Sequence, residues 1–282
     1  MHAFSGPPST HSPWAREFAC DAVAGARMAN SPRGSRRLPV DCAACRASVE
    51  GLCRDCAPEV RRVIASYKSG ERVLKAGDNL FRPAEPCDAI YHLVDGWVFL
   101  YNLIDDGRRQ ILHFALPGAL LGLYPGRVAV YGAQALTDAT VSLIPHERLG
   151  PLVEEHPGVG LRLAWTVWRE RNLAYDHLCS LGRRSARERV ARSLLELFVR
   201  YRMQWPAHRT EDMHLPLTQE HLGDATGLTG VHVNRILHGL RSDGIVEFHY
   251  RRLRILNPDK LLDVARVDPQ TVLSWTGRHP HA

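Results

Sequence analysis

The segment LTQEHLGDATGLTGVHVNRILHGLRSDGIVEF, from Leu217 to Phe248, constrains the fold more than any other part of the chain. Thr218 can cap a short helix around Leu222, and Gly227 can supply the positive φ that ends it. Thr229 can cap a second helix, in which apolar residues at i, i+3, i+4 and i+7 face inward. Two short helices joined by a glycine-containing turn predict a helix-turn-helix.

The outward face of the second helix carries a guanidinium, which can pair with guanine, and an amide, which can pair with adenine. A solvated polar face is the neutral interpretation. The residues that follow favour DNA binding, because two short β-rich runs flank a basic tip suited to phosphate. They predict a two-stranded wing. The candidate DNA-binding residues are Thr229, Val231, His232, Asn234, Arg235, His238, Arg251 and Arg252.

From about Val63 to Leu149, short β-rich runs alternate with turn residues. Asp95-Gly96 and Asp105-Asp106-Gly107 both lie between apolar runs, and Asp-Gly in that position is a hairpin signal. Strands spaced by roughly ten residues are typical of a small antiparallel roll or barrel. The region therefore predicts an antiparallel β-roll.

After Pro157 the pattern turns helical, with an apolar seam whose spacing of 4, 3, 4, 3, 4 is that of a heptad repeat. A helix that faces its own core could show the same stripe. Asn172 favours pairing of two helices, because a polar residue inside a seam fixes their register. The expected dimerisation residues are Leu161, Trp165, Trp168, Asn172, Tyr175 and Cys179.

Together these patterns predict an α+β protein: an N-terminal antiparallel β-roll, a long dimerisation helix and a C-terminal winged helix-turn-helix. Ser185 and Glu188 fit a capping box at the start of a helix that should run from about Ala186 to Arg202. The expected divisions are a flexible tail at 1–38, a cysteine-rich segment with the roll at 39–150, the dimerisation helix at 151–182, the DNA-binding domain at 183–268 and a second tail at 269–282.

Four of the seven cysteines lie within CAACRASVEGLCRDC, from Cys42 to Cys56. In a reducing compartment, clustered thiols are more often metal ligands or redox groups than disulfides. Seven residues separate the two C-x2-C pairs, which is short for a zinc ribbon, where about 15–20 are usual. A thiol–disulfide switch needs no metal, and cysteines without a cofactor are a further alternative.

The net charge is +6, and the last hundred residues hold 16 Lys and Arg against 11 Asp and Glu. This excess favours a polyanionic partner. The chain has neither a run of 18 apolar residues nor a secretory signal, so we expect a cytoplasmic protein without a membrane span. It also lacks a P-loop, a G-x-S-x-G motif and a paired-carboxylate signature, so we do not expect an enzyme.

The order of roll, seam helix and winged helix-turn-helix resembles the Crp/Fnr family of bacterial transcription regulators over roughly residues 40 to 268. The most specific stretches are FALPGALLGL, ALTDATVSLIPHERL, LGRRSARERVA and the helix-turn-helix itself. The resemblance implies a homodimer that reads a palindromic site on double-stranded DNA with two recognition helices. It further implies an interaction with RNA polymerase and control by a ligand or cofactor in the N-terminal half.

The cyclic-AMP members of this family hold the phosphate with a Gly-Glu pair and an Arg-Ser pair in the roll. Gly122 is present here, but Leu123 stands in place of the glutamate. Tyr131 and Gly132 stand roughly where the arginine and serine would be. Because the cation for the phosphate is missing, we do not expect cyclic AMP to bind.

The oxygen-sensing Fnr branch carries three of its four iron–sulfur ligands just ahead of the roll, where this chain has its four cysteines. The family's fourth ligand falls within ATVSLIP, where this chain has Ser142. By resemblance we expect an iron–sulfur cluster, [4Fe–4S] before [2Fe–2S], and a response to oxygen or redox state. The expected ligands are Cys42, Cys45, Cys53 and Cys56, with Cys87 as an alternative fourth. The alternative function is a regulator with a small-molecule effector in the roll and cysteines that are structural, zinc-bound or thiol-switching.

Two further positions carry expectations. The Fnr branch has a glutamate where Val231 stands and a serine where Asn234 stands, whereas its arginine matches Arg235. Each changed base contact is worth about 1–3 kcal/mol of discrimination, so the half-site should differ. His92 and His113 lie in predicted strands. Haem ligation through them is conceivable, but we interpret them as satisfied structural groups.

Overall fold

The structure is a computed structural model that describes residues 45, 47, 51–54, 56–123, 128–204 and 212–275. All of them belong to one structural unit, Gly34–Ala282. The expected tail at 1–38 and Cys42 lie outside the described residues. Within the described residues, no helix is long and apolar enough to span a membrane.

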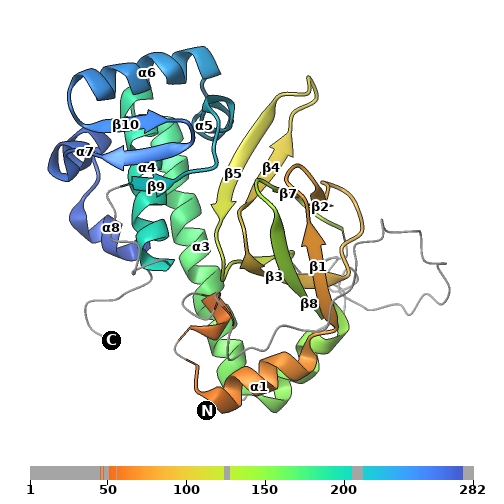
Figure 1. Ribbon diagram of the computed structural model, residues 1–282. Helices are drawn as coiled ribbons and strands as arrows, with labels where there is room; N and C mark the ends of the chain where they lie inside the picture. The colour runs from red at the N-terminus through yellow and green to blue at the C-terminus, as the bar shows by residue number, and fades with distance from the viewer. Residues whose placement is uncertain are drawn as a thin grey trace, which may run out of the picture. The chain divides into compact units, whose positions relative to one another are not determined.

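Two four-stranded antiparallel sheets form the β-roll, with strand orders β1-β8-β3-β6 and β2-β7-β4-β5 (Figure 1). The roll confirms the antiparallel architecture predicted from the alternating runs. Its strands are β1 Gly70–Leu74, β2 Asn79–Phe81, β3 Ala89–Asp95, β4 Val98–Leu103, β5 Arg109–Ala115, β6 Leu120–Leu121, β7 Gly132–Ala135 and β8 Ala139–Pro145.

The two Asp-Gly signals have different outcomes. Asp105-Asp106-Gly107 joins β4 to β5, which pair antiparallel, so that hairpin prediction is confirmed. Asp95-Gly96 joins β3 to β4, which lie in different sheets, so that hairpin prediction is wrong. Gly96 has a φ of +87°, and a Cβ there would lie 2.4 Å from the Asp138 carbonyl oxygen. The glycine therefore lets the chain cross between two closely packed sheets.

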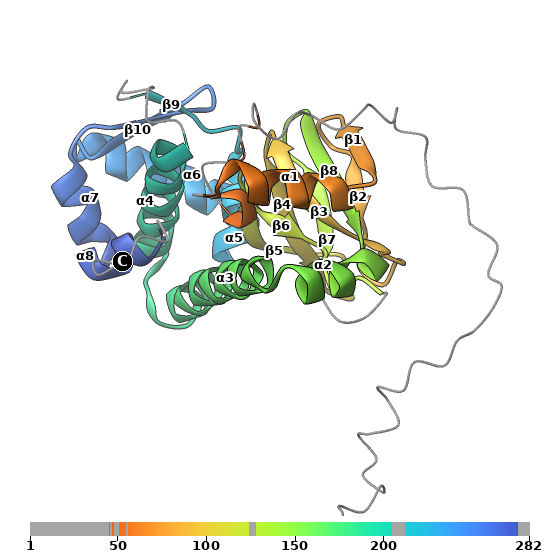
Figure 2. The same ribbon diagram turned by 90° about the horizontal axis from the view of Figure 1, so that it is seen from below.

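One face of the sheet that contains β3 and β8 is covered by the helices α1 (Pro58–Tyr67), α2 (Leu149–Glu155) and the start of α3 (Pro157–Arg183) (Figure 2). Ile64 of α1 and Leu152 of α2 share one apolar cluster with residues of both strands. The expected helix at 151–182 is thus two helices. The break falls at His156, because the residue before a proline is disfavoured in the α region.

The C-terminal part contains α4 (Ala186–Gln204), α5 (Gln219–Thr226), α6 (Gly230–Ser242) and α7 (Pro258–Ala265). The capping box is present, since the Ser185 N–H donates to Glu188 Oε2 at 2.8 Å. The wing has three strands rather than two: β10 (Val246–His249), β11 (Arg252–Ile255) and β9 (Asp212–His214).

The segment expected to be a C-terminal tail from residue 269 begins with a further helix, α8 (Pro269–Trp275). Trp275 is 1% exposed, and its indole Nε1–H donates to Asp176 of α3 at 3.2 Å. The expectation of a tail is therefore wrong as far as residue 275. A single buried tryptophan fixes a helix that is too short to show a periodic pattern.

Candidate nucleic-acid interface and sensor site

The caps of the helix-turn-helix lie where the sequence predicts them. The Thr218 hydroxyl accepts from the His221 N–H, and His221 Nδ1 accepts from the Thr218 N–H, each at 3.2 Å. Gly227 ends α5 in the left-handed region, with a φ of 66°. The Thr229 hydroxyl accepts from the His232 N–H at 3.2 Å and so caps α6.

The face of α6 that points away from the core presents Asn234, Arg235 and His238 as exposed side chains. Val231 is 73% exposed, and His232 is half-buried. The amide of Gln219, in α5, donates to Asn234 Oδ1 at 3.1 Å and so orients this side chain. The opposite face is buried through Val233, Ile236, Leu237 and Leu240, as the stripe predicts.

The wing lies beside the start of α6. Arg251 and Arg252 are exposed, and Tyr250 is 87% exposed at the turn between β10 and β11. The ring centroids of His249 and Tyr250 are 4.3 Å apart. A groove of about 590 Å³ runs between the wing turn and α6, and Val231 also lines it. Tyr250 is an interface candidate that the sequence analysis missed, and a bulky residue between two short β-rich runs was its only signal.

The seam predicted on α3 lies on the side that the protomer does not bury. Trp165 is 63% exposed, Leu161, Trp168, Tyr175 and Cys179 are exposed too, and Asn172 is half-buried. The protomer's own core takes other α3 residues, among them Leu163 and Leu173. The interpretation that the seam serves the protomer's own core is therefore wrong.

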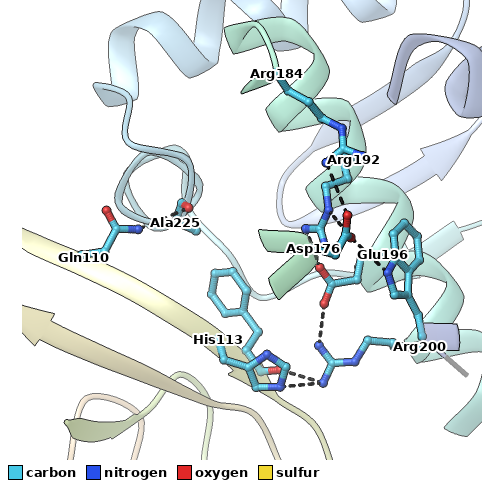
Figure 3. A network of polar contacts seen from close by, with 10 residues as sticks. Gln110, His113, Asp176, Arg184, Arg192, Glu196, Arg200 and Ala225 are labelled. Carbon is cyan, nitrogen blue, oxygen red and sulfur yellow. Dashed lines mark hydrogen bonds and ion pairs between the residues drawn. The ribbon is translucent and has the colours of Figure 1, made fainter. Parts of the chain in front are cut away.

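A buried polar network joins strand β5 to α4 and α3 (Figure 3). Arg200 donates to the Phe114 carbonyl at 2.8 Å and contacts His113 Nε2 at 3.2 Å. Glu196 accepts from Arg200 at 3.0 Å and from Arg192 at 2.8 Å. Arg192 also donates to Asp176 of α3 at 2.6 Å.

The charges in this network compensate one another. Burial alone would raise the pKa of Glu196, but Arg192 and Arg200 bring it to about 2. Burial, followed by the charge of Arg200, lowers the pKa of His113 to about 3, so this imidazole is neutral at pH 7. A second link joins the same strand to the helix-turn-helix, because Arg109 forms an ion pair with Asp224 of α5 at 2.7 Å.

The three described cysteines of the N-terminal cluster are buried but lie in two apolar clusters. Cys45 packs with Ala47 and Val94, whereas Cys53 and Cys56 pack in the cluster that contains Ile90. Within the described part of the chain, no three His, Cys, Asp or Glu side chains are grouped so as to hold a metal ion. Cys42, the remaining expected ligand, lies outside the described residues.

Cys87, the alternative fourth ligand, lies elsewhere. It is buried in the interior of the roll, in the apolar cluster that contains Leu121 and Val141. Its Sγ is 3.5 Å from the Ala89 carbonyl oxygen. The structure therefore does not bring Cys87 together with Cys45, Cys53 or Cys56.

His92 and Ser142 form a buried polar pair in the sheet under the cysteine segment. They face each other across β3 and β8 in the strand register. Neither ring nitrogen of His92 nor the Ser142 hydroxyl has a hydrogen-bond partner in the described structure. The interpretation as a satisfied group is therefore wrong for His92, although His113 does have a polar partner in Arg200. Thiols and a neutral imidazole are the ligand types of a thiolate-bound metal group.

Tyr131, which by the family resemblance stands roughly where the cyclic-AMP members carry an arginine, packs against the interior cluster of the roll. Its ring centroid is 5.9 Å from that of Phe81, and the Gly122 N–H donates to its hydroxyl at 3.4 Å. Burial raises the pKa of Tyr131 to about 12, so this group carries no charge at pH 7. A neutral phenol cannot balance a phosphate, which supports the expectation that cyclic AMP does not bind.

Known domain families match both halves of the chain. The cyclic nucleotide-binding domain matches residues 71–156, and the Crp-like helix-turn-helix domain matches residues 188–264. The structure of FixK2 from Bradyrhizobium japonicum is similar, with a TM-score of 0.65 and 32% identity, and the match covers 70% of this chain and 98% of that one.

Three curated relatives show the same likeness in sequence. The nitrogen fixation regulation protein FixK of Bradyrhizobium diazoefficiens is 31% identical over 220 residues, which are 74% of this chain and 92% of the relative. The transcriptional activatory protein AadR of Rhodopseudomonas palustris is 34% identical over 64% of this chain and 75% of the relative. The transcriptional activator protein FnrL of Cereibacter sphaeroides is 31% identical over 66% of this chain and 73% of the relative. The chain therefore belongs to the Crp/Fnr family of transcription regulators.

Proposed function

We propose that the protein is a homodimeric regulator that reads an inverted-repeat DNA site with α6, acts with RNA polymerase and responds to oxygen or redox state. The observation that carries the DNA-reading part is the exposed polar face of α6 beside a basic wing. The proposed base-reading and phosphate contacts are those named from the sequence: Thr229, Val231, His232, Asn234, Arg235, His238, Arg251 and Arg252.

Within this proposal Arg235 donates two hydrogen bonds to a guanine, and Val231 contacts a thymine methyl group. Arg251 and Arg252 contact phosphates, which position the protein without reading sequence. Two copies pair along the exposed seam of α3, so that two α6 helices enter major grooves about one helical turn apart.

The proposed sensor is an iron–sulfur cluster on Cys42, Cys45, Cys53 and Cys56. The family resemblance and the burial of the three described thiols support it. When bound, such a cluster supplies oxygen-sensitive redox chemistry. The chain itself supplies a path to the dimer helix, because Arg162 of α3 donates to the Arg54 carbonyl, between Cys53 and Cys56, at 2.5 Å. A change in the cysteine segment would therefore bias α3 between two states.

The test is anaerobic purification of the full chain, followed by analysis of iron, sulfide and zinc and by DNA binding before and after exposure to air. We expect iron and sulfide in the wild-type protein and weaker DNA binding after air. Cys45→Ser should lose both the metal and the response to air, whereas Cys87→Ala, at a buried cysteine in a different cluster of the roll, should keep them. Protein that holds no iron and binds DNA equally well in air would contradict the sensing part and leave the DNA-reading part standing.

A further inference from the structure

Strand β3, which lies under the cysteine segment, carries His92, a buried histidine with no hydrogen-bond partner among the described residues. Side chains alternate along a strand, so Ile90 and His92 of β3 share one face of the sheet. Val94 follows at a shift in the strand register between Leu93 and Asp95. Ile90 belongs to the same cluster as Cys53 and Cys56. Val94 packs with Cys45. His92 therefore lies between the two places where the cysteine segment contacts β3.

The surroundings of His92 are unlike those of an ordinary buried histidine. The residue is 1% exposed, and neither ring nitrogen has a hydrogen-bond partner in the described structure. His113 is half-buried in the same roll, but it contacts Arg200. Burying an imidazole without partners is unfavourable, so such a group in a native fold calls for an explanation, and a bound ion or water is one.

Ser142, directly opposite His92, strengthens this indication. It is fully buried, and its hydroxyl also has no partner among the described residues. Metal-bound histidines generally donate their second N–H to an oxygen, which fixes the ring orientation. A serine hydroxyl across the strand pair can accept that bond.

We propose that His92 is a ligand of the metal group bound by Cys45, Cys53 and Cys56, and that Ser142 accepts a hydrogen bond from its other ring nitrogen. The inference rests on the proposed cysteine metal site and gives it His92, from the roll, as fourth donor in place of Cys42. Three thiolates and one neutral imidazole suit zinc, and both ligand types also occur at iron–sulfur clusters.

Metal binding must then bring the thiols of Cys45, Cys53 and Cys56 and the His92 ring closer together, because within the described residues these donors are not grouped as a metal site. Such closure is expected where a metal site forms together with the fold around it. The imidazole is ready for this role, since burial and the charge of Lys68 favour its neutral form.

The test uses the full chain and two probes: Co²⁺, whose absorption bands report thiolate and imidazole ligands, and anaerobic reconstitution with iron and sulfide. The variants are His92→Leu, His92→Cys and Ser142→Ala, and Cys87→Ala is the matched control with a buried donor outside the site. Melting of the metal-free proteins separates loss of a ligand from misfolding.

We expect His92→Leu to weaken Co²⁺ binding more than Ser142→Ala, for which about tenfold is expected. Metal-free His92→Leu should melt no lower than the wild type, because the substitution removes a buried polar group without a partner. His92→Cys should bind Co²⁺ with shifted bands, since a thiolate replaces the imidazole. Cys87→Ala should bind as the wild type does.

A His92→Leu protein with wild-type affinity and an unchanged Co²⁺ spectrum would overturn the inference while leaving the cysteine site in place. A wild-type protein that takes up neither Co²⁺, zinc nor iron would overturn the cysteine site and the inference together. Iron with sulfide, or zinc alone, in the purified wild-type protein identifies which metal group the donors hold, and either supports the inference.

Discussion

Arg235 is the residue on which base recognition depends in this account. It is exposed on α6, whose start is capped by Thr229. A guanidinium in this position can form two hydrogen bonds with one guanine. Arg241 offers a matched comparison, because it is an exposed arginine in the last turn of the same helix.

Substitution of Arg235 and of Arg241 by alanine tests this role in base recognition. Arg235→Ala should weaken binding to the selected site by about 1–3 kcal/mol and relax the base preference at one position. Arg241→Ala should leave the base preference unchanged. Binding measured on a panel of single-base variants checks both. An equal loss on all sequences would show that Arg235 contacts only phosphate.

The wing turn carries the second prediction. Tyr250 and Arg251 have φ values of 47° and 60°, a turn geometry that favours Asn-Gly. Tyr250→Asn with Arg251→Gly should therefore raise the free energy of unfolding by about 1–2 kcal/mol, since the left-handed region is costly for other residues. The same double variant should bind DNA more weakly, because a phosphate-binding arginine is lost.

Ala84→Gly is the control for the wing, because Ala84 has a φ of 63° in the roll, outside the proposed DNA interface. It should leave DNA binding unchanged. Thermal melting and a titration with DNA give the two readouts. A double variant that binds DNA as tightly as the wild type would remove the wing turn from the interface.

For single residues, the sequence predicts those features that depend on residues close by in the chain. The caps at Thr218, Gly227 and Thr229 depend on residues two to four positions away, and all three are confirmed. The lack of a hydrogen bond at His92 depends instead on the residue opposite it in the sheet, Ser142, which lies fifty positions later in the chain. No local pattern specifies that pairing, so the sequence alone supports only the ordinary interpretation of a strand histidine.

Among the helices and strands, α3 carries a row of exposed apolar side chains that its own protomer does not bury. Its apolar residues divide into a face buried by the protomer and an exposed seam that contains Trp165 and Tyr175. Exposed apolar surface of this kind marks an interaction site. Pairing of two α3 helices would bury it.

Trp165→Glu tests this assignment. Placing a carboxylate in the seam should weaken the dimer by about 2 kcal/mol or more, the loss expected at an interface hot spot, a class in which tryptophan is enriched. Leu103→Glu in β4 is the control, because Leu103 is apolar and 55% exposed but lies away from α3. Sedimentation over a range of concentrations is the measurement. Dimers of equal strength in both variants would place the interface elsewhere.

Elements with a strong repeating pattern are also the ones that the sequence predicts. The seam of α3 and the apolar stripe of α6 are visible in the chain, and both helices are present. The short elements β9 and α8 were missed, because three or seven residues carry no periodic signal. The crossing at Gly96 was misread because an Asp-Gly pair looks the same at a hairpin and at a crossing between sheets.

For the molecule as a whole, the buried network around Glu196 connects the roll to α4 and α3 (Figure 3). His113 in this network and His92 in the roll are both neutral, with the pKa of each lowered to about 3. Burial is the first cause for both. The stability of the protein should therefore depend on pH well above the range in which carboxylates titrate.

Both histidines have an ordinary pKa of 6.5, so the unfolded chain takes up protons before the folded one does. The stability that the two neutral imidazoles contribute to the folded state is fully present above pH 6.5 and is lost as pH falls toward 3. The free energy of unfolding should fall by about 1.4 kcal/mol per pH unit for each histidine, or by about 2 kcal/mol for each between pH 6.5 and 5. Glu196 adds a further loss below pH 4.5, its ordinary value.

Denaturant unfolding of the metal-free protein from pH 7.5 to 5 checks this prediction. His92→Leu should remove one histidine's share of the slope, whereas Ser142→Ala should retain it. A wild-type stability that stays constant over this range would mean that neither imidazole is held neutral in the folded state.

The central claim is that two copies of this chain present paired α6 helices to one duplex. Selection of bound duplexes from a random-sequence DNA pool by the purified, reduced full-length protein tests it most directly, with the stoichiometry of the selected complex measured alongside. The account predicts an inverted repeat with half-site centres about 10–10.5 base pairs apart, bound by two protomers. Enrichment of no inverted repeat, or a complex with a single protomer, would contradict it.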